Sequence, residues 1–99
     1  MASMMIRPES EDLRIVVALI KGMTIPAGVI SYDITFDEDW TGEASIYILV
    51  KVNEKYIAAK KKHFRDVVTF TDEVQKQALQ LGVSRWPYVR LVSGRARKG

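Results

Sequence analysis

The chain has 99 residues, of which 47% are hydrophobic and 27% charged, and its net charge at pH 7 is +3. This length and composition are typical of one globular domain and exclude a disordered chain. Because there is no cysteine and the one histidine is His63, thiolate chemistry, cysteine-ligated metal centres and histidine-rich metal sites are excluded as well. The sequence therefore predicts no catalytic residue, no metal site and no cofactor, and it leaves non-enzymatic binding roles.

The N-terminal part of the chain has no feature of a membrane or secreted protein. Its longest apolar run, residues 15–20, is far shorter than the roughly 20 residues of a membrane span. Charged residues between positions 9 and 14 interrupt any secretory signal. We therefore expect a cytoplasmic protein with no membrane partner, in which residues 1–9 form a disordered leader, residues 10–93 a single domain and residues 94–99 a flexible basic tail.

The first predicted element is a helix over residues 10–23. Apolar residues recur there at the spacing that forms one stripe along a helix. They are Leu13, Val16, Val17 and Ile20. Ser10 is predicted to cap the N-terminus of this helix, and Gly22 is a candidate for its end.

Two strands follow, because apolar and polar residues alternate over residues 30–36 and 46–52. They most simply form an antiparallel hairpin closed by residues 37–43, in which Gly42 takes a positive φ. The carboxylates of this connection resemble the start of a calcium-binding loop, but Ile48 stands where that loop requires a glutamate. No calcium site is therefore predicted.

The second half is predicted to contain a long helix and a strand. Residues 53–65 fit either a helix or a hairpin return, and we favour a helix or irregular structure. A helix is predicted from its N-cap at Asp72 to Leu81, and apolar spacing extends it back to Phe64, although the β-branched run over residues 67–71 opposes that extension. Gly82 fits a left-handed helix end, and a third strand is predicted over residues 88–92.

The predicted order is therefore α-β-β-α-β, with a possible extra turn of helix before the second long one. Its simplest solution is an α+β two-layer sandwich, with the helices packed on one face of a small three-stranded sheet. A strand that follows a helix can lie parallel to its neighbour through a right-handed crossover.

Charge is divided unequally along the chain. Residues 1–49 carry three Lys and Arg against eight Asp and Glu, a net −5, whereas residues 50–99 carry twelve against four, a net +8. A basic half indicates a nucleic acid or an acidic partner, or the two halves neutralise each other within the fold. The protein is predicted to be a monomer or a weak homodimer in which the acidic loop of one copy meets the basic helix of another.

Four residues are predicted to form a protein interface. Trp, Tyr and Arg dominate the energetics of such surfaces. The candidates are Trp40, Trp86, Tyr88 and Arg90. Trp40 is either tucked against the sheet edge or presented to a partner, and of Trp86 and Tyr88 we expect one to be buried.

The densest basic cluster is the alternative candidate, for contact with an RNA backbone. Its members are Lys60, Lys61, Lys62 and Arg65. The cluster could equally be a solvated helix face, because the chain has no Gly-x-x-Gly or Gly-Phe-Gly motif of known RNA modules. His63 is expected to be a surface histidine.

Two resemblances follow from these segments. The pattern Phe-x-Glu-Asp-Trp-x-Gly-Glu at residues 36–43, with Trp-Pro-Tyr-Val-Arg at residues 86–90, resembles a group of small uncharacterised prokaryotic proteins, some of them associated with toxin–antitoxin-like gene pairs. That resemblance covers residues 29–93 and implies a non-enzymatic accessory or antitoxin role, without assigning functional residues. Separately, the element order is similar to that of type II KH-like domains such as ribosome-binding factor A, an analogy of fold alone.

The leading prediction is therefore a non-catalytic protein–protein interaction module, antitoxin-like or an accessory subunit. The alternative is an RNA-binding domain of KH-like element order that acts through its basic second half.

Overall fold

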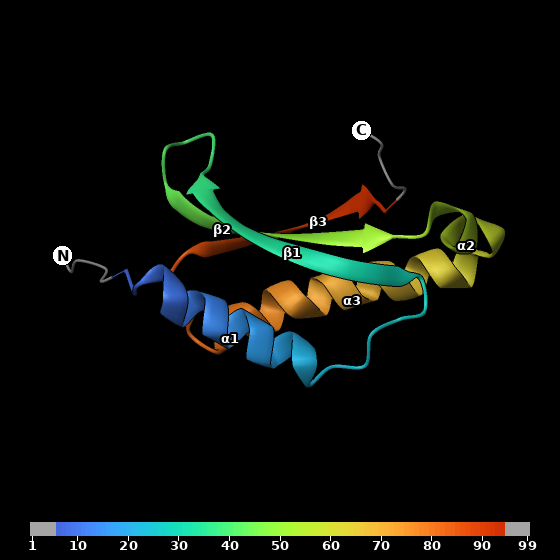
Figure 1. Ribbon diagram of the computed structural model, residues 1–99, viewed down its shortest axis with the longest axis horizontal. Coiled ribbons are helices and arrows are strands. Elements are labelled where there is room, and N and C mark those ends of the chain that lie inside the picture. The colour runs from blue at the N-terminus through green and yellow to red at the C-terminus, as the bar shows by residue number, and fades with distance from the viewer. Residues whose placement is uncertain (1–5, 95–99) are drawn as a thin grey trace.

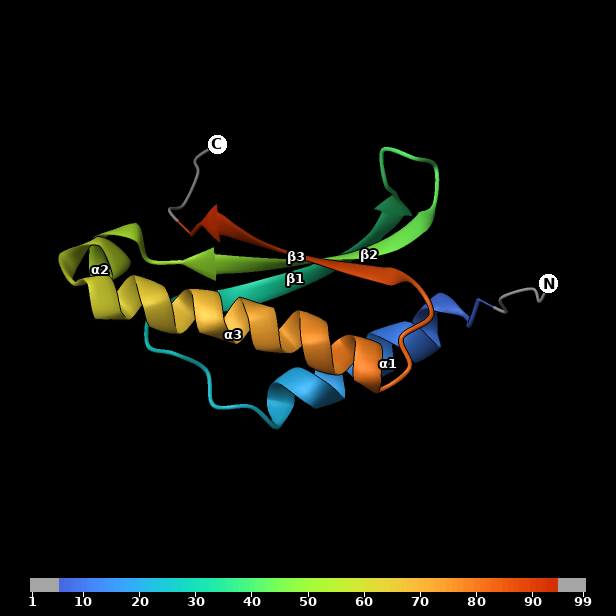
Figure 2. The same cartoon turned by 180° about the vertical axis from the view of Figure 1, so that it is seen from behind.

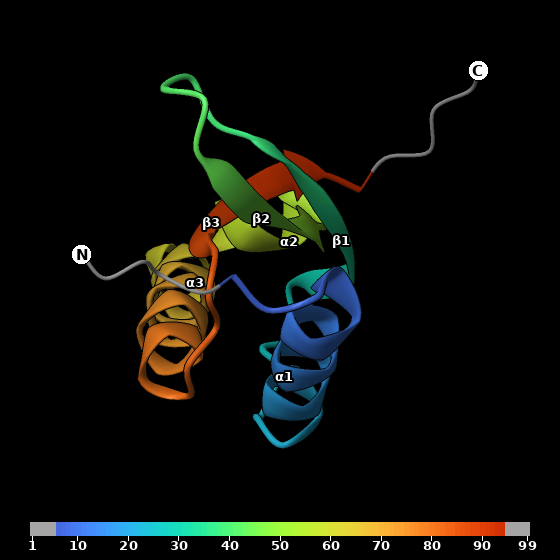
Figure 3. The same ribbon diagram turned by 90° about the vertical axis from the view of Figure 1, so that its left-hand side faces the viewer.

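The computed structural model describes residues 6–94 (Figure 1). The elements, in chain order, are α1 (Glu9–Lys21), β1 (Val29–Glu38), β2 (Ala44–Val52), α2 (Glu54–Ala59), α3 (Lys61–Gln80) and β3 (Trp86–Ser93). Helices α1 and α3 lie on one face of the sheet and leave the other face open (Figure 3), while α2 packs against α3 at the end of the sheet (Figure 1). The predicted α+β class, the element order and the two-layer arrangement are confirmed, and α2 is the extra helical segment.

The central strand of the sheet is β2, which pairs with β1 antiparallel and with β3 parallel. Parallel neighbours need a crossover connection, and α2 and α3 supply it, with α3 running beneath β3 (Figure 2). Along β2, Ile46, Ile48 and Val50 are fully buried under the helices, whereas Tyr47 and Leu49 are half-buried on the opposite face. This alternation separates a core face from an open face.

The core lies between the sheet and helices α1 and α3. Its fully buried helical residues are β-branched or small: Val16, Ile20, Val67, Val74 and Ala78. The helix α3 begins at Lys61, so Asp72 lies inside it and is not its N-cap. The β-branched run at residues 67–71 costs less than about 0.7 kcal/mol of helix propensity per residue, and burying a valine stabilises by roughly 1.5–3 kcal/mol. Packing therefore outweighs propensity.

The ends of the helices correct one prediction and confirm another. The helix α1 begins at Glu9, directly after Pro8, so Ser10 lies in its first turn and does not cap it. Proline is favoured next to a helix start because its fixed φ is compatible with the helix. At the C-terminus of α3, Gly82 has the predicted left-handed conformation, with φ +95°.

Two backbone hydrogen bonds lie just outside the predicted domain of residues 10–93. Arg7 donates its backbone N–H to Ser84 Oγ over 2.9 Å. Gly94 donates its N–H to the carbonyl of Val52 over 2.9 Å. The rest of the predicted leader, residues 1–5, and of the predicted tail, residues 95–99, lie outside the described residues.

The strands are longer than predicted and contain one irregularity. The register of β1 against β2 shifts between Val29 and Ser31, and Ile30 is consequently 56% exposed although it continues the apolar alternation. The strand β3 includes Pro87, which an edge strand accepts because no neighbour requires its missing N–H. The carbonyl of Pro87 accepts a hydrogen bond from Gln75 Nε2 over 2.9 Å.

A buried carboxylate connects α1 to the segment that leads into β3. Asp12 is fully buried, and its Oδ1 accepts the backbone N–H of Ser84 over 3.1 Å. Its Oδ2 accepts from Ser84 Oγ and from Arg85 Nη1, each over 2.8 Å. The same Arg85 nitrogen donates to the carbonyl of Arg7 over 3.0 Å. This network, here called the Asp12 clamp, satisfies the charge with three donors.

Asp12→Ala should lower the free energy of unfolding by about 3–5 kcal/mol, because it leaves the largely buried guanidinium of Arg85 without its partner. Urea denaturation followed by circular dichroism measures the loss. The matched control is Glu11→Ala, which removes the exposed pair with Arg7 and should cost less than about 1 kcal/mol. Equal losses in the two variants would contradict a stabilising clamp.

Candidate functional site

The junction between α2 and α3 is shaped by a cap and a break. The side chain of Asn53 accepts the N–H of Tyr56 over 3.0 Å and so caps α2. Lys60 then takes an extended conformation, with φ −145° and ψ 142°, and α3 begins at the next residue. Of the two alternatives for residues 53–65, the helical one is therefore correct, and the chain turns sharply at Lys60.

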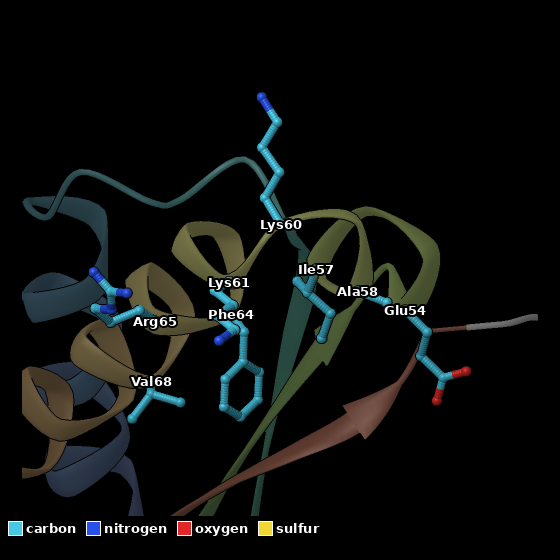
Figure 4. A pocket seen from close by; sticks show the side chains of 8 residues that line it. All are labelled: Glu54, Ile57, Ala58, Lys60, Lys61, Phe64, Arg65 and Val68. Atoms are coloured by element: carbon cyan, nitrogen blue, oxygen red, sulfur yellow. The ribbon is translucent and has the colours of Figure 1, made fainter.

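An open groove of about 630 Å³ lies along this junction. Its apolar lining is Ile57, Ala58, Phe64 and Val68. Figure 4 shows Ile57, Phe64 and Val68 pointing to the same side of the two helices. Phe64 is 50% exposed, so an aromatic face in this groove is available to a ligand.

Three of the four predicted basic residues line this groove. They are Lys60, Lys61 and Arg65, all exposed, and Glu54 is the one carboxylate among the lining residues. Lys62 points elsewhere: it pairs with Asp66 over 3.1 Å and lines a neighbouring hollow. The groove therefore combines an apolar floor with three cationic residues, while Lys62 lies outside its lining and Lys60 lines both hollows.

His63 stabilises the junction. Its ring stacks on that of Tyr56, with centroids 4.0 Å apart and planes 4° apart. Its Nδ1 lies 2.8 Å from the carbonyl oxygen of Tyr56, to which it donates a hydrogen bond because a carbonyl only accepts. His63 is half-buried rather than a free surface histidine, and it holds the first turn of α3 against α2.

The open face of the sheet collects three of the four predicted interface residues. Trp86, Tyr88 and Arg90 alternate along β3 and pair in register with the open-face residues of β2. The rings of Tyr47 and Tyr88 are stacked, with centroids 5.1 Å apart, and the guanidinium of Arg90 lies 5.4 Å from the Tyr47 centroid. Trp86 is 49% exposed and Tyr88 half-buried, so neither is a core residue.

Trp40 lies at the tip of the turn between β1 and β2, and it is 90% exposed. The carbonyl of Asp39 accepts the N–H of Gly42 over 2.9 Å, and Gly42 has the predicted positive φ of +87°. This combination is a three-residue hairpin loop with a glycine bulge. Of the two alternatives for Trp40, presentation to solvent is the one observed.

The carboxylate of Asp39 holds this turn together. Its Oδ1 accepts from Thr41 Oγ1 over 2.6 Å and from the backbone N–H groups of Thr41 and Glu43. Its Oδ2 accepts from the hydroxyl of Tyr88 over 2.9 Å. These hydrogen bonds lower the pKa of Asp39 from 3.8 to about 2, and the bond from the Thr41 hydroxyl has the largest effect. The same carboxylate raises the pKa of Tyr88.

The acidic and basic halves of the chain neutralise each other only in part. Two ion pairs of the described residues join the halves, Lys51 with Asp33 over 3.0 Å and Arg85 with Asp12 over 2.8 Å. The acidic turn and the basic groove lie towards opposite ends of the molecule (Figure 1). Each therefore keeps a local charge of its own.

Comparisons with protein-family models, with curated proteins and with solved structures find no match for this chain. Within residues 6–94, no helix is long and apolar enough to cross a membrane. The same stretch holds no group of three or more metal-ligating side chains.

We expect Asp39 to titrate near pH 2 in the folded protein, which carboxyl ¹³C NMR measures directly. Because the folded pKa lies below the ordinary value, this group contributes stability that is complete above pH 3.8 and is lost as the pH falls towards about 2. Thr41→Val should raise the pKa of Asp39 more than Tyr88→Phe, since the Thr41 hydroxyl has the larger effect. The opposite ranking would show that Tyr88 is the principal donor.

Proposed function

We propose that this protein is a non-catalytic, cytoplasmic domain that binds single-stranded RNA in the groove between α2 and α3. The observation that supports this most directly is the half-exposed Phe64 ring on an apolar floor, in a groove whose lining also includes Lys60, Lys61 and Arg65. The sequence alone favours a protein partner over RNA. RNA ranks first here because apolar and cationic side chains share one groove.

A single strand of RNA has the two kinds of group that this groove can bind, phosphates and unpaired bases. Its phosphates are attracted to Lys and Arg, with release of counterions. Its unpaired bases present flat faces that stack on aromatic rings, worth about 1–3 kcal/mol per base. A purely apolar ligand would leave the cations unused, and a simple anion would leave the floor of Ile57, Phe64 and Val68 unused.

A single strand fits better than a duplex, because paired bases are not accessible for stacking on a side chain in a groove. The element order similar to that of type II KH-like domains agrees with this substrate, since KH domains bind single-stranded RNA. That likeness is one of fold and assigns no residue. The chain has no Gly-x-x-Gly motif, so the phosphate contacts proposed here are made by side chains.

The triple variant Lys60→Gln, Lys61→Gln, Arg65→Gln should bind a labelled oligouridylate more weakly and with a flatter salt dependence. Each neutralised single-strand phosphate contributes about 0.7 to the slope of log affinity against log salt, so three lost contacts should reduce that slope by about 2. Fluorescence anisotropy from low to moderate salt measures it. All three side chains are exposed, and circular dichroism should show an unchanged fold.

Two further variants make the test specific to the groove. Lys62→Gln changes the same charge beside the groove but outside its lining, and it should leave the slope unchanged. Phe64→Ala should weaken binding by about tenfold, within the range of one lost base stack, without changing the slope. A Lys62 effect of about 0.7 in slope, the same per charge as in the triple variant, would show nonspecific attraction to a basic surface and overturn the proposed site.

The open face of the sheet supports a second candidate function, a protein–protein interaction module. Trp86 is half-exposed there, and within residues 6–94 Arg90 has no ion pair. One face of Tyr47 and one of Tyr88 are turned to each other, which leaves less aromatic surface for base stacking. A protein partner that presents a carboxylate to Arg90 fits this surface, and the antitoxin or accessory role implied by the sequence resemblance belongs to this candidate.

The double variant Trp86→Ala, Arg90→Ala should lose a protein partner that the wild type retains. Co-purification from the native host followed by mass spectrometry measures this, with Leu81→Ala as the control because Leu81 is an equally exposed apolar residue outside this face. Hot-spot residues of this kind each cost 2 kcal/mol or more, roughly thirtyfold in affinity. Identical partners in all three samples would remove this candidate.

A further inference from the structure

Trp40 is presented to solvent by a turn that is already ordered. Its side chain is 90% exposed, while the carboxylate of Asp39, directly before it, accepts the backbone N–H groups of Thr41 and Glu43 that follow it. A rigid support lowers the entropy that binding would otherwise cost. Tryptophan is also the residue type most enriched among interface hot spots. The turn therefore offers an apolar anchor ready for insertion into a pocket.

The surroundings of Trp40 are acidic. The carboxylates nearest to it in the sequence are Asp37, Glu38, Asp39 and Glu43. The groove at the α2–α3 junction is the complementary surface: it is open, and its lining combines apolar side chains with three cationic residues and one carboxylate. An indole that enters this groove would bring its carboxylates close to the cations, and complementary charge of this kind favours one partner over others.

The two surfaces cannot meet within one copy. The turn lies at one end of the molecule and α2 at the other, along an axis that extends for 49 Å (Figure 1). Seen from the side of α3 and β3, the turn and α2 are again at opposite ends (Figure 2). Two copies placed side by side and antiparallel would bring each turn to the groove of the other, so that one two-fold axis creates both contacts.

We propose that this chain forms an antiparallel homodimer in which the Trp40 turn of each copy occupies the α2–α3 groove of the other. The proposed function assigns this same groove to RNA, so the dimer and the RNA complex exclude each other. In this one respect the inference rests on the proposed function. The self-association itself is measured without RNA and so stands or falls separately.

Sedimentation velocity over a range of protein concentrations at low salt tests the dimer. The wild type should change from monomer to dimer as concentration rises, and the dimer should weaken as salt screens the charges of turn and groove. Trp40→Ala should weaken association about thirtyfold or more, as for an aromatic hot spot, while Leu81→Ala should not. A wild-type protein that stays monomeric at every concentration would overturn the proposal.

Mixing two variants tests the contact directly. Trp40→Ala keeps an intact groove, and Phe64→Ala keeps an intact turn, so a mixed dimer regains one complete contact that neither variant can form alone. The mixture should therefore associate more strongly than either variant by itself. A mixture no stronger than its components would show that Trp40 and Phe64 do not meet across the dimer, and the proposal would be wrong.

Addition of oligouridylate separates the two proposals. RNA that binds and converts the dimer to monomers supports a shared groove, whereas a dimer that persists with RNA bound at Lys60, Lys61 and Arg65 overturns the assignment of Trp40 to that groove. Emission from Trp40, observed in a Trp86→Phe background, should shift to shorter wavelength on dimerisation and back on RNA binding. If RNA does not bind while the dimer forms, the proposed function fails and the dimer is upheld.

Discussion

The buried carboxylate of Asp12 is the interaction on which the rest of the arrangement depends. A charge without access to water is tolerated only where donors surround it, and here Ser84 and Arg85 provide three. Both donors stand directly before β3. Holding them against α1 sets where β3 enters the sheet, and so sets its parallel pairing with β2. The position of β3, in turn, places Trp86, Tyr88 and Arg90 beside β2 on the open face.

A sheet covered on one side supports two surfaces of different chemistry. The covered face uses the β-branched residues of β2 for the core, which leaves the alternate positions free to carry Tyr47 and, on β3, Tyr88 and Arg90. The helical layer ends in the short helix α2 and a break at Lys60, after which α3 begins. Phe64 lies in the first turn of α3 and is half-exposed there. Lys60, Lys61 and Arg65 line the same groove.

Much of the fold and part of the candidate site could be predicted from local pattern. Alternation revealed β1 and β2, the apolar spacing of α3 was recognised despite its β-branched run, and Gly42 and Gly82 were placed correctly because few other residues accept positive φ. The caps proposed at Ser10 and Asp72 were wrong, since a capping residue type is common inside helices as well. The separation of Lys62 from its neighbours was not foreseeable, because it depends on which side of the first turn of α3 faces the groove.

The sequence by itself determined the α+β class, the element order, the two charged regions and the residue types available for binding. These follow from periodicity, composition and spacing, which act over one or two turns of chain. Only the tertiary structure decided that Asp12 is buried, that Trp86, Tyr88 and Arg90 share a face with Tyr47, and that Phe64 and three cations share a groove. Each of these three features depends on contacts between different helices and strands. Such contacts are determined by how the surfaces of the elements pack together and not by local sequence preference.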